Sequence, residues 1–342
     1  GGCAPGYNAV TAYLVEKLEQ IGRSSFIAAQ GFRSLISNRD TDYRCLIHNR
    51  DLFDRLDHVP GVVFAPPLKE TRGANFRSER FPQFKDVANQ EIAAKNIVDR
   101  KTKAVIAIGG NGTLKGAKAL AMQLGDLIPI FFIPVTIDSD VSGTACIGEY
   151  TGIEVGSEKI RCYMADARTH NRLYIIEMMG AHGGYHALHS CLGAGAHLAV
   201  LPGQNHDMAK LIPALNMRNG TVIVVAEGYQ RLERKAVDYQ GNAAEWFRDE
   251  LIEAGLNTKQ KVVCEPFSRD IRGASPNNMD LMLAQRMARS VAQMLENGDH
   301  SKMPTVNQHE EDALHFNEIK TDNSTTSSLA SLANRLYATS IK

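Results

Sequence analysis

The chain has 342 residues, of which 44% are hydrophobic and 22% charged, a globular composition with enough length for two domains. Lysine plus arginine equals aspartate plus glutamate at 38 each, so no overall field points to a nucleic acid or an anionic membrane as partner. The apolar peak at Leu127–Val135 has only a strand's length, which excludes a membrane span there. Six scattered cysteines without a C-x-x-C pair indicate reduced thiols, so we expect a soluble, cytoplasmic protein.

Apolar segments rich in β-branched residues alternate with segments of helical periodicity, and glycine stands at most of the joins. Strands are predicted at Ser25–Gln30, Lys103–Ile108, Ile128–Pro134, Leu173–Met178, His197–Leu201, Thr221–Ala226 and Gln260–Cys264. Helices are predicted at Asn8–Ile21, Leu114–Leu124, Tyr185–Leu192, Met208–Met217, Ala243–Ala254 and Asn278–Leu295. Repetition of strand, helix and strand requires parallel sheets with covered faces, so the fold class is α/β.

Other segments have the composition of loops. Arg39–Gln90 carries many charges and several prolines, which predicts surface loops and short elements. Asp138–Gly152 is rich in Gly, Ser, Thr and Asp, which indicates a long functional loop. The chain starts directly at Gly1-Gly2, where a glycine turn would normally follow a strand, so we expect further residues upstream of Gly1.

Two glycine turns between a strand and a helix have the composition of anion sites. They are Gly1–Asn8 and Gly109–Thr113. Glycines let backbone N–H groups approach phosphate oxygens, and a helix N-terminus adds partial positive charge. Neither turn has the spacing of a P-loop or of the dinucleotide fingerprint. Each is therefore either a phosphate site or a tight turn without a ligand.

A third candidate follows the apolar strand that ends at Pro134. The segment Thr136–Asp140 carries two carboxylates, Asp138 and Asp140, beyond the carboxyl end of that strand, where parallel sheets bind their ligands. Such a pair can supply a general base and a metal contact. The alternative is ordinary turn chemistry, for which Asp is well suited.

In this order the turns resemble the signatures of the phosphofructokinase family: G-G-x-x-P-G-x-N, R-F, G-G-D-G-[ST], T-I-D-N-D, M-G-R, A-E-G and Q-R-G-G-x-P. The matching segments are Gly1–Asn8, Arg80-Phe81, Gly109–Thr113, Thr136–Asp140, Met179-Gly180, Ala226–Gly228 and Arg272–Pro276. The resemblance implies two Rossmann-like three-layer domains with mainly parallel sheets. Residues 1–133 plus about 265–342 would bind the nucleotide, and residues 134–264 would bind the sugar phosphate.

The activity implied by the resemblance is ATP-dependent transfer of a phosphoryl group to the 1-hydroxyl of fructose 6-phosphate in glycolysis, with Mg²⁺. Asp138 falls on the catalytic base, Thr136 on a positioning residue, and Arg80 near the transferring phosphate. The implied nucleotide contacts are Gly2, Arg80, Phe81, Gly110, Asn111, Gly112 and Thr113. The implied sugar contacts are Thr136, Asp138, Arg172, Met179, Gly180, Glu227, Arg269 and Arg272. Asn111 and Asp140 are the candidate metal contacts.

The resemblance also implies an assembly. Arg172 falls on an arginine that reaches a neighbouring subunit's site, so we expect a homo-oligomer, a dimer or a tetramer. A hetero-oligomer with a catalytic homologue is the other possibility.

Several chemical positions depart from the family pattern. Asn111 replaces the aspartate that helps hold Mg²⁺, so metal binding should weaken. Ala181 replaces the arginine of M-G-R and removes a cation that would contact the substrate. Val263 stands where a further phosphate-binding arginine is expected, and Arg269 where a histidine is usual. These departures favour either a divergent enzyme or a degenerate one.

The phosphoryl donor can be inferred from two positions. Pyrophosphate-dependent relatives carry an aspartate and a lysine where this chain has Gly112 and Val135. Gly112 leaves room for a nucleotide, and Val135 offers pyrophosphate no ammonium group, so ATP is favoured. The alternatives are a pyrophosphate-dependent phosphofructokinase and a non-catalytic regulatory subunit that binds phosphorylated effectors.

Overall fold

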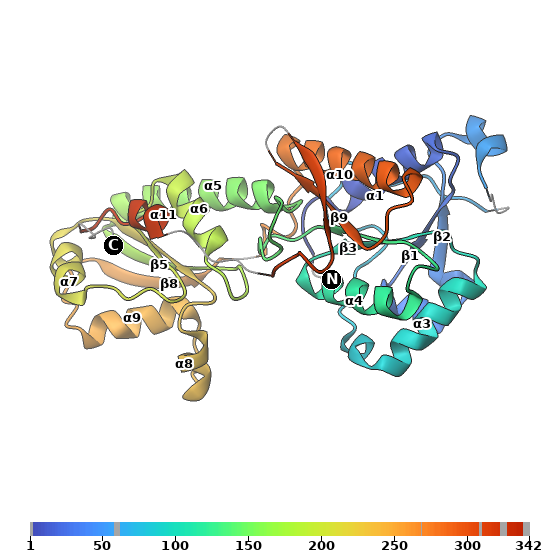
Figure 1. The fold of residues 1–342 in the computed structure, drawn as a ribbon. Helices are drawn as coiled ribbons and strands as arrows, with labels where there is room; N and C mark the ends of the chain where they lie inside the picture. The colour runs from blue at the N-terminus through green and yellow to red at the C-terminus, as the bar shows by residue number, and fades with distance from the viewer. Residues whose placement is uncertain (1–2, 58–61, 268, 308–309, 322–326, 338–342) are drawn as a thin grey trace. The chain divides into compact units, whose positions relative to one another are not determined.

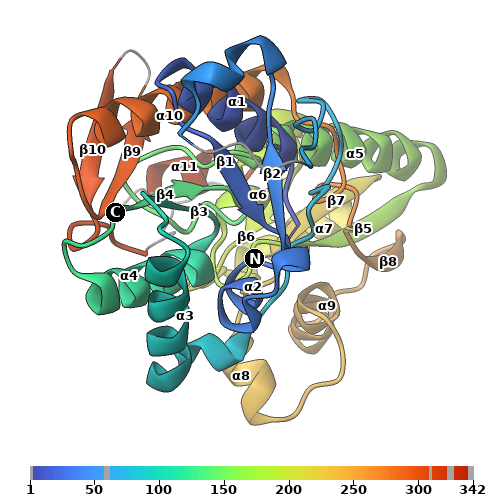
Figure 2. The same cartoon turned by 90° about the vertical axis from the view of Figure 1, so that its right-hand side faces the viewer.

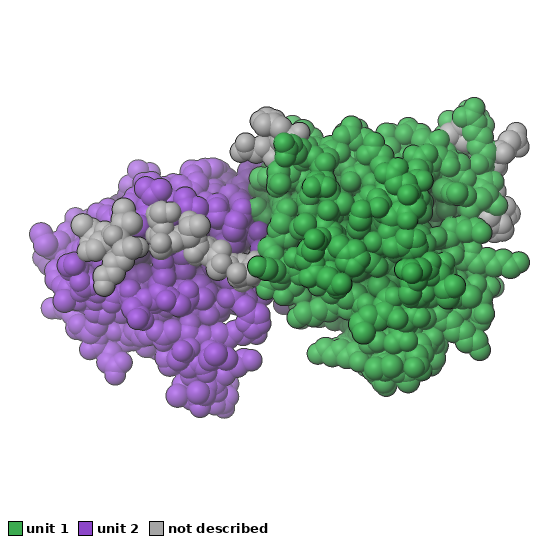
Figure 3. Space-filling view, viewed as in Figure 1, with its two compact units in different colours: residues 1–136, 140–151, 272–321 green, residues 137–139, 152–271, 322–342 purple. Residues whose placement is uncertain are grey.

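The computed structural model describes residues 3–57, 62–267, 269–307, 310–321 and 327–337. Its chain forms two compact units, shown in separate colours in Figure 3. Unit 1 consists of residues 1–136, 140–151 and 272–321, and unit 2 of residues 137–139, 152–271 and 322–342. Among the described helices, none combines the length and apolarity needed to cross a membrane.

Unit 1 is built on a mixed sheet with the strand order β10-β9-β4-β3, in which β10 alone runs antiparallel to its neighbour. The strands of the unit are β1 (Ser25–Ala28), β2 (Tyr43–Leu46), β3 (Val105–Gly109), β4 (Ile130–Pro134), β9 (Lys302–Val306) and β10 (Glu311–His315). Its helices are α1 (Tyr7–Gln20), α2 (Phe32–Ser37), α3 (Val87–Asp99), α4 (Asn111–Leu124) and α10 (Asn278–Glu296). Helices α1 and α10 cover one face of the sheet and α3 and α4 the other, so the unit has three layers (Figures 1 and 2).

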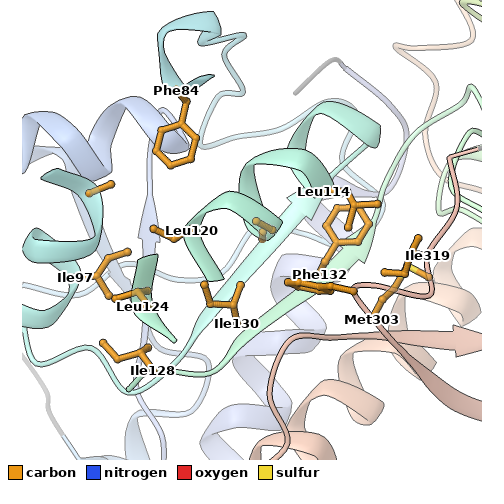
Figure 4. Packing of buried hydrophobic residues seen from close by; sticks show 14 of the residues in the cluster. Phe84, Ile97, Leu114, Leu120, Leu124, Ile128, Ile130, Phe132, Met303 and Ile319 are labelled. Atoms are coloured by element: carbon orange, nitrogen blue, oxygen red, sulfur yellow. The ribbon is translucent and has the colours of Figure 1, made fainter. Parts of the chain in front are cut away.

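The core of unit 1 joins strand β4 to helix α4, as Figure 4 shows. Side chains alternate along a strand, so Ile130 and Phe132 lie in the same cluster. Helical spacing places Leu114, Leu120 and Leu124 on the face of α4 that packs on them. Burial of each such side chain contributes about 1.5–3 kcal/mol, so this cluster fixes the ends of β3, β4 and α4.

Unit 2 is built on a parallel sheet with the strand order β6-β7-β5-β8. Its strands are β5 (Arg172–Met178), β6 (Leu198–Val200), β7 (Thr221–Ala226) and β8 (Lys261–Pro266). Its helices are α5 (Glu149–His170, which begins in unit 1), α6 (Tyr185–Ala194), α7 (Met208–Met217), α8 (Arg231–Ala236), α9 (Ala243–Glu253) and α11 (Ser327–Leu332). Helices α5 and α6 lie on one face of the sheet, and α7 and α9 on the other (Figure 1). Both faces of β7 are therefore buried along its whole length, as its unbroken apolar sequence predicts.

The predicted fold class, α/β with mainly parallel sheets, is confirmed. The limits of the two units differ from the expected domain boundaries, which were residues 133/134 and about 265. Residues 140–151 group with unit 1, because the carboxylate of Asp280 in α10 accepts hydrogen bonds from the N–H groups of Gly148 at 2.9 Å and Thr151 at 2.8 Å. The final residues group with unit 2, because Arg335 N donates to the carbonyl of His197 at 2.8 Å.

Candidate active site

In unit 1 the carboxyl ends of β3 and β4 are neighbours. Gly109 is paired with Pro134, and Val135 N donates a hydrogen bond to the carbonyl of Gly109 at 2.9 Å. The turn after β3 and the loop after β4 therefore start side by side. This is the edge of a parallel sheet where ligands bind.

Two glycines allow the turn after β3 to pack closely. A Cβ atom at Gly109 would lie 2.3 Å from Thr113 Oγ1, and one at Gly110 would lie 3.2 Å from Thr136 Cβ. Helix α4 begins at Asn111 directly after this turn. The first N–H groups of a helix have no partner inside the helix and attract anions, so the turn presents a helix N-terminus suited to an anion beside Thr136.

Asn111, a candidate metal contact, is half-buried at the start of α4. Its Oδ1 atom is enclosed and accepts no hydrogen bond from the described residues. An amide oxygen in this state suits a cation or a polar ligand group. The described part of the chain forms no cluster of three or more His, Cys, Asp or Glu that could hold a metal. Mg²⁺ is usually bound through one or two protein oxygens and substrate phosphates, and the Oδ1 atom of Asn111 fits such a ligand.

The loop after β4 carries the candidate base. Thr136 is buried, 8% exposed, and its N–H donates to the carbonyl of Ile147 at 3.0 Å. Asp138 is half-buried in a bend, and Ser139 has the left-handed backbone angle φ of 48°. Such a conformation is uncommon for a residue other than glycine, so the surrounding structure holds this bend in place. Asp140 is also half-buried and belongs to unit 1.

Phe81 and Arg80 lie on the loop before α3. Phe81 is half-buried against the core of unit 1, with the guanidinium of Arg33 5.1 Å from its ring centre. Arg33 also pairs with Glu79 at 2.7 Å, which fixes the cation over the ring. The side chain of Arg80 is exposed and accessible to a ligand. Gly2, the remaining expected nucleotide contact, lies outside the described residues.

In unit 2 the carboxyl ends of β5 and β7 lie together. Glu227 N donates to the carbonyl of Met178 at 2.8 Å, which places Glu227 beside the loop that starts at Met179. One carboxylate oxygen of Glu227, Oε2, accepts the N–H groups of Gly180 and Ala181, both at 3.3 Å. The structure thus brings Met179, Gly180 and Glu227 together at one edge of the sheet.

A cavity of about 330 Å³ opens at this edge. Three carboxylates and three cations line it: Glu177, Glu227, Asp238, Arg231, Arg234 and Lys235. Burial raises the pKa of Glu177, and the nearby carboxylates of Glu227 and Glu245 raise it further. The guanidinium of Arg234 and the N–H of Ala243, which donates a hydrogen bond to Glu177 at 2.6 Å, lower this pKa in part. The cavity therefore combines hydrogen-bond acceptors with positive charge.

Arg172 lies at the opposite end of β5 from this cavity. Its Nη1 atom is 2.7 Å from Asp166 Oδ2 and 2.9 Å from the hydroxyl of Tyr174, which donates to the same Asp166 oxygen at 2.6 Å. The hydrogen bond from Tyr174, followed by the one from Arg172, lowers the pKa of Asp166. Arg172 and Met178 are six residue steps apart along the strand, a distance of about 20 Å. Within one chain, Arg172 is therefore not brought to Glu227.

The two arginines after β8 belong to different units. Arg269 is exposed in a turn of unit 2. Arg272 is half-buried in unit 1, where its Nη1 atom donates to the carbonyl of Cys3 at 3.4 Å, and Cys3 Sγ donates to the carbonyl of Arg272 at 3.2 Å. Arg272 thus contacts the first glycine turn.

Sequence reasoning missed the charged residues of α8. Arg231 and Arg234 follow the A-E-G motif within the run R-L-E-R-K, and this run was the available signal. A run of charged residues usually marks a solvent-exposed helix face. That this run lines a cavity follows only from the contacts of α8 with the loops after β5 and β7.

Comparison with known proteins assigns this arrangement to a family. The sequence model described as "Phosphofructokinase" matches residues 1–295, so the chain belongs to the phosphofructokinase family. The chain is 33% identical over 241 residues to an ATP-dependent 6-phosphofructokinase of Aquifex aeolicus, covering 68% of each chain. It is 28% identical over 323 residues to the ATP-dependent 6-phosphofructokinase of Mycobacterium tuberculosis, covering 90% of this chain and 88% of the relative.

Solved structures share the fold. The phosphofructokinase of Pichia pastoris in the T-state superposes with a TM-score of 0.73 at 21% identity, covering 93% of this chain and 34% of that one. The chain thus spans about a third of the Pichia pastoris chain. A pyrophosphate-dependent phosphofructokinase of Marinobacter aquaeolei gives a TM-score of 0.71 at 16% identity, covering 97% of this chain and 89% of the other.

Proposed function

We propose that the protein transfers the γ-phosphoryl group of ATP to the 1-hydroxyl of fructose 6-phosphate, giving fructose 1,6-bisphosphate. Family membership and the names of its relatives as ATP-dependent 6-phosphofructokinases support the reaction. The close approach of Gly110 to Thr136 carries the assignment of the site. This contact fixes a helix N-terminus suited to phosphate beside Thr136, two residues before Asp138 along the chain.

The nucleotide phosphates bind to the N–H groups at the start of α4 and to the exposed guanidinium of Arg80. Asn111 and Asp140 are the residues that would hold Mg²⁺ together with the phosphates, and the ion would supply positive charge to the transferring group. Asp138 accepts the proton of the sugar's 1-hydroxyl while the oxygen of that hydroxyl forms a bond to the γ-phosphorus. The bond from that phosphorus to ADP breaks, ADP leaves, and Thr136 positions the reacting groups.

The sugar phosphate binds to the loops of unit 2. Met179, Gly180 and Glu227, which lie together at the carboxyl ends of β5 and β7, are the proposed sugar contacts. Of the two phosphate-binding arginines that the resemblance implies, Arg269 lies in this unit. Arg172 acts in a neighbouring copy, because it lies at the far end of β5 from the sugar contacts of its own chain. A homo-oligomer follows from this assignment.

ATP is the proposed donor. A Cβ atom at Gly112 would meet nothing within 4 Å, so the start of α4 leaves room for a nucleotide. Val135 is buried and offers no positive charge. The pyrophosphate-dependent alternative is distinguished by supplying each donor in turn.

The second candidate function is that of a regulatory subunit. The departures at Asn111 and Ala181 favour it, since both remove charge from the family's catalytic set. Such a subunit would bind phosphorylated effectors and assemble with a catalytic homologue.

One assay separates these functions. The purified protein is incubated with fructose 6-phosphate, Mg²⁺ and either ATP or pyrophosphate, and the phosphorylated product is identified by ³¹P nuclear magnetic resonance. We expect fructose 1,6-bisphosphate with ATP alone. Product with pyrophosphate alone would overturn the donor. If no product forms with either donor, and the protein raises the turnover rate of an added catalytic homologue, the protein is a regulatory subunit.

A further inference from the structure

The loops after β5 and β7 form one wall of the cavity in unit 2. A Cβ atom at Gly228 would lie 2.7 Å from the carbonyl oxygen of His182 and 3.1 Å from that of Ala181. Glycine is therefore required for the approach of these loops. The contact brings the start of α8 next to position 181, where the family's arginine is missing.

Three non-glycine residues on the loops that border this cavity have a left-handed backbone. Ala181, Gln230 and Asp238 have left-handed φ angles of 55°, 42° and 50°. The side chain of Gln230, directly before α8, is anchored because its Oε1 accepts from Trp246 Nε1 at 2.8 Å. Left-handed residues other than glycine cost on the order of 1–3 kcal/mol and gather where side chains are held for a ligand.

The two arginines of α8 have different roles. Arg234 donates to the carbonyls of Glu227 at 2.6 Å and Tyr229 at 3.0 Å, so its guanidinium holds the turn. Arg231 makes one long contact, from Nη1 to the carbonyl of Ala181 at 3.4 Å. Among the described residues no other hydrogen-bond acceptor of Arg231 is found, so most of its donors remain for a ligand in the cavity.

The chemistry of the lining fits a phosphorylated sugar. The carboxylates of Glu177, Glu227 and Asp238 can accept sugar hydroxyls, while Arg231 and Lys235 can bind phosphate oxygens. The volume of about 330 Å³ suits a small metabolite. A ligand with phosphate alone would leave the carboxylates facing its negative charge.

We propose that Arg231 supplies, from helix α8, the positive charge that Ala181 lacks, and that it binds the phosphorylated sugar in this cavity. This inference rests on the proposed function for the identity of the sugar phosphate. It makes α8 a specificity element of the chain, in which a cation from a different loop replaces the one absent from the motif.

The test is the variant Arg231→Gln, with Arg161→Gln as matched control. Arg161 is an exposed arginine of α5 in the same unit and pairs with Glu158 on the surface. Loss of a charge-assisted hydrogen bond predicts a KM for fructose 6-phosphate about tenfold or more higher, with the KM for ATP changed less than about twofold. Melting temperatures of the variants should agree, and Arg161→Gln should match the wild type.

A second variant separates charge from structure. Ala181→Arg in the Arg231→Gln background places a cation at the residue whose carbonyl Arg231 contacts, so we expect it to recover at least part of the lost affinity. A KM for fructose 6-phosphate within about twofold of wild type in Arg231→Gln would overturn the inference, as would equal changes in both KM values.

Calorimetric titration with fructose 6-phosphate measures binding without turnover, so it tests the role of Arg231 separately from the proposed reaction. If the wild type binds the sugar phosphate without turnover, the proposed reaction fails, and a loss of binding in Arg231→Gln still supports the role of Arg231. If the wild type turns over and Arg231→Gln binds equally well, the reaction stands and the role of Arg231 is refuted. Absence of binding to the wild type refutes it too.

Discussion

At the scale of single residues, Asn111 is the proposed metal contact. Its enclosed Oδ1 atom accepts no hydrogen bond from the described residues, so the position is suited to a ligand, yet it brings no charge. The metal would depend on the phosphates for its negative charge. A carboxylate at this position should therefore strengthen Mg²⁺ binding.

We predict that Asn111→Asp lowers the Mg²⁺ concentration for half-maximal turnover by about tenfold, because a charged ligand replaces a neutral one. The measurement is the rate against Mg²⁺ at constant ATP. Asn89→Asp, which adds the same charge at a half-buried position in the first turn of α3, is the control and should not shift the curve. An unchanged Mg²⁺ dependence in Asn111→Asp would show that position 111 does not contact the metal.

At the scale of elements, periodicity predicted the buried segments well. The strand Thr221–Ala226 and the helix Met208–Met217 have the predicted bounds, because continuous apolar burial and a clear apolar face leave little choice. Helix α5 was missed: its first turns lie in a glycine-rich stretch with the composition of a loop. Contacts with other elements compensate, among them the hydrogen bond from Ser157 Oγ to the carbonyl of Ser190 in α6 at 3.3 Å.

The turn that opens α4 carries the second prediction. In Gly110→Ala the new Cβ would lie 3.2 Å from Thr136 Cβ, so the two loops must separate by a few tenths of an ångström. Because small displacements of positioned groups are costly, we expect kcat/KM for ATP to fall about 10- to 100-fold.

The control for Gly110→Ala is Gly125→Ala at the other end of α4. Gly125 has a φ of 53°, and a Cβ there would meet nothing within 4 Å, so this variant should lose some stability and keep its kcat/KM. If both variants lose activity in proportion to their melting temperatures, the turn has only a structural role.

At the scale of the whole molecule, the order of motifs along the chain indicated the family, and the α/β pattern indicated the sheets. The extent of the two units could not be predicted, because it depends on single long-range contacts, such as Asp280 with Gly148 or Arg335 with His197. The family resemblance implied Glu227 as a sugar contact, a role that remains a prediction, but could not show that α8 brings Arg231 to the same cavity as Glu227.

Stability of unit 2 should depend on pH through His206. Burial lowers the pKa of His206 to about 4 from its ordinary 6.5, so the unfolded chain binds this proton more readily than the folded one. Above pH 6.5 His206 is neutral in both the folded and the unfolded chain, so it adds no pH dependence to stability there. As the pH falls from 6.5 toward 4, the folded state loses stability relative to the unfolded state. The expected loss from His206 is about 1–3 kcal/mol.

Urea unfolding followed by fluorescence of the single tryptophan, Trp246 in α9, reports on unit 2 at each pH. We expect His206→Gln to flatten the acid slope relative to the wild type, and His315→Gln, at an exposed position of unit 1, to leave it unchanged. Parallel curves for wild type and His206→Gln would show that His206 does not titrate with unfolding.

The most direct measurement for the whole account is the turnover of Asp138→Asn beside the wild type, with ATP, Mg²⁺ and fructose 6-phosphate in a coupled assay. The substitution keeps the size of the side chain and removes its ability to accept a proton, so we predict a kcat lower by about 10²- to 10⁴-fold, with little change in either KM. Asp126→Asn, at an exposed position after α4, should keep the wild-type rate. A rate for Asp138→Asn within about twofold of the wild type would contradict the assignment of Asp138 as the general base.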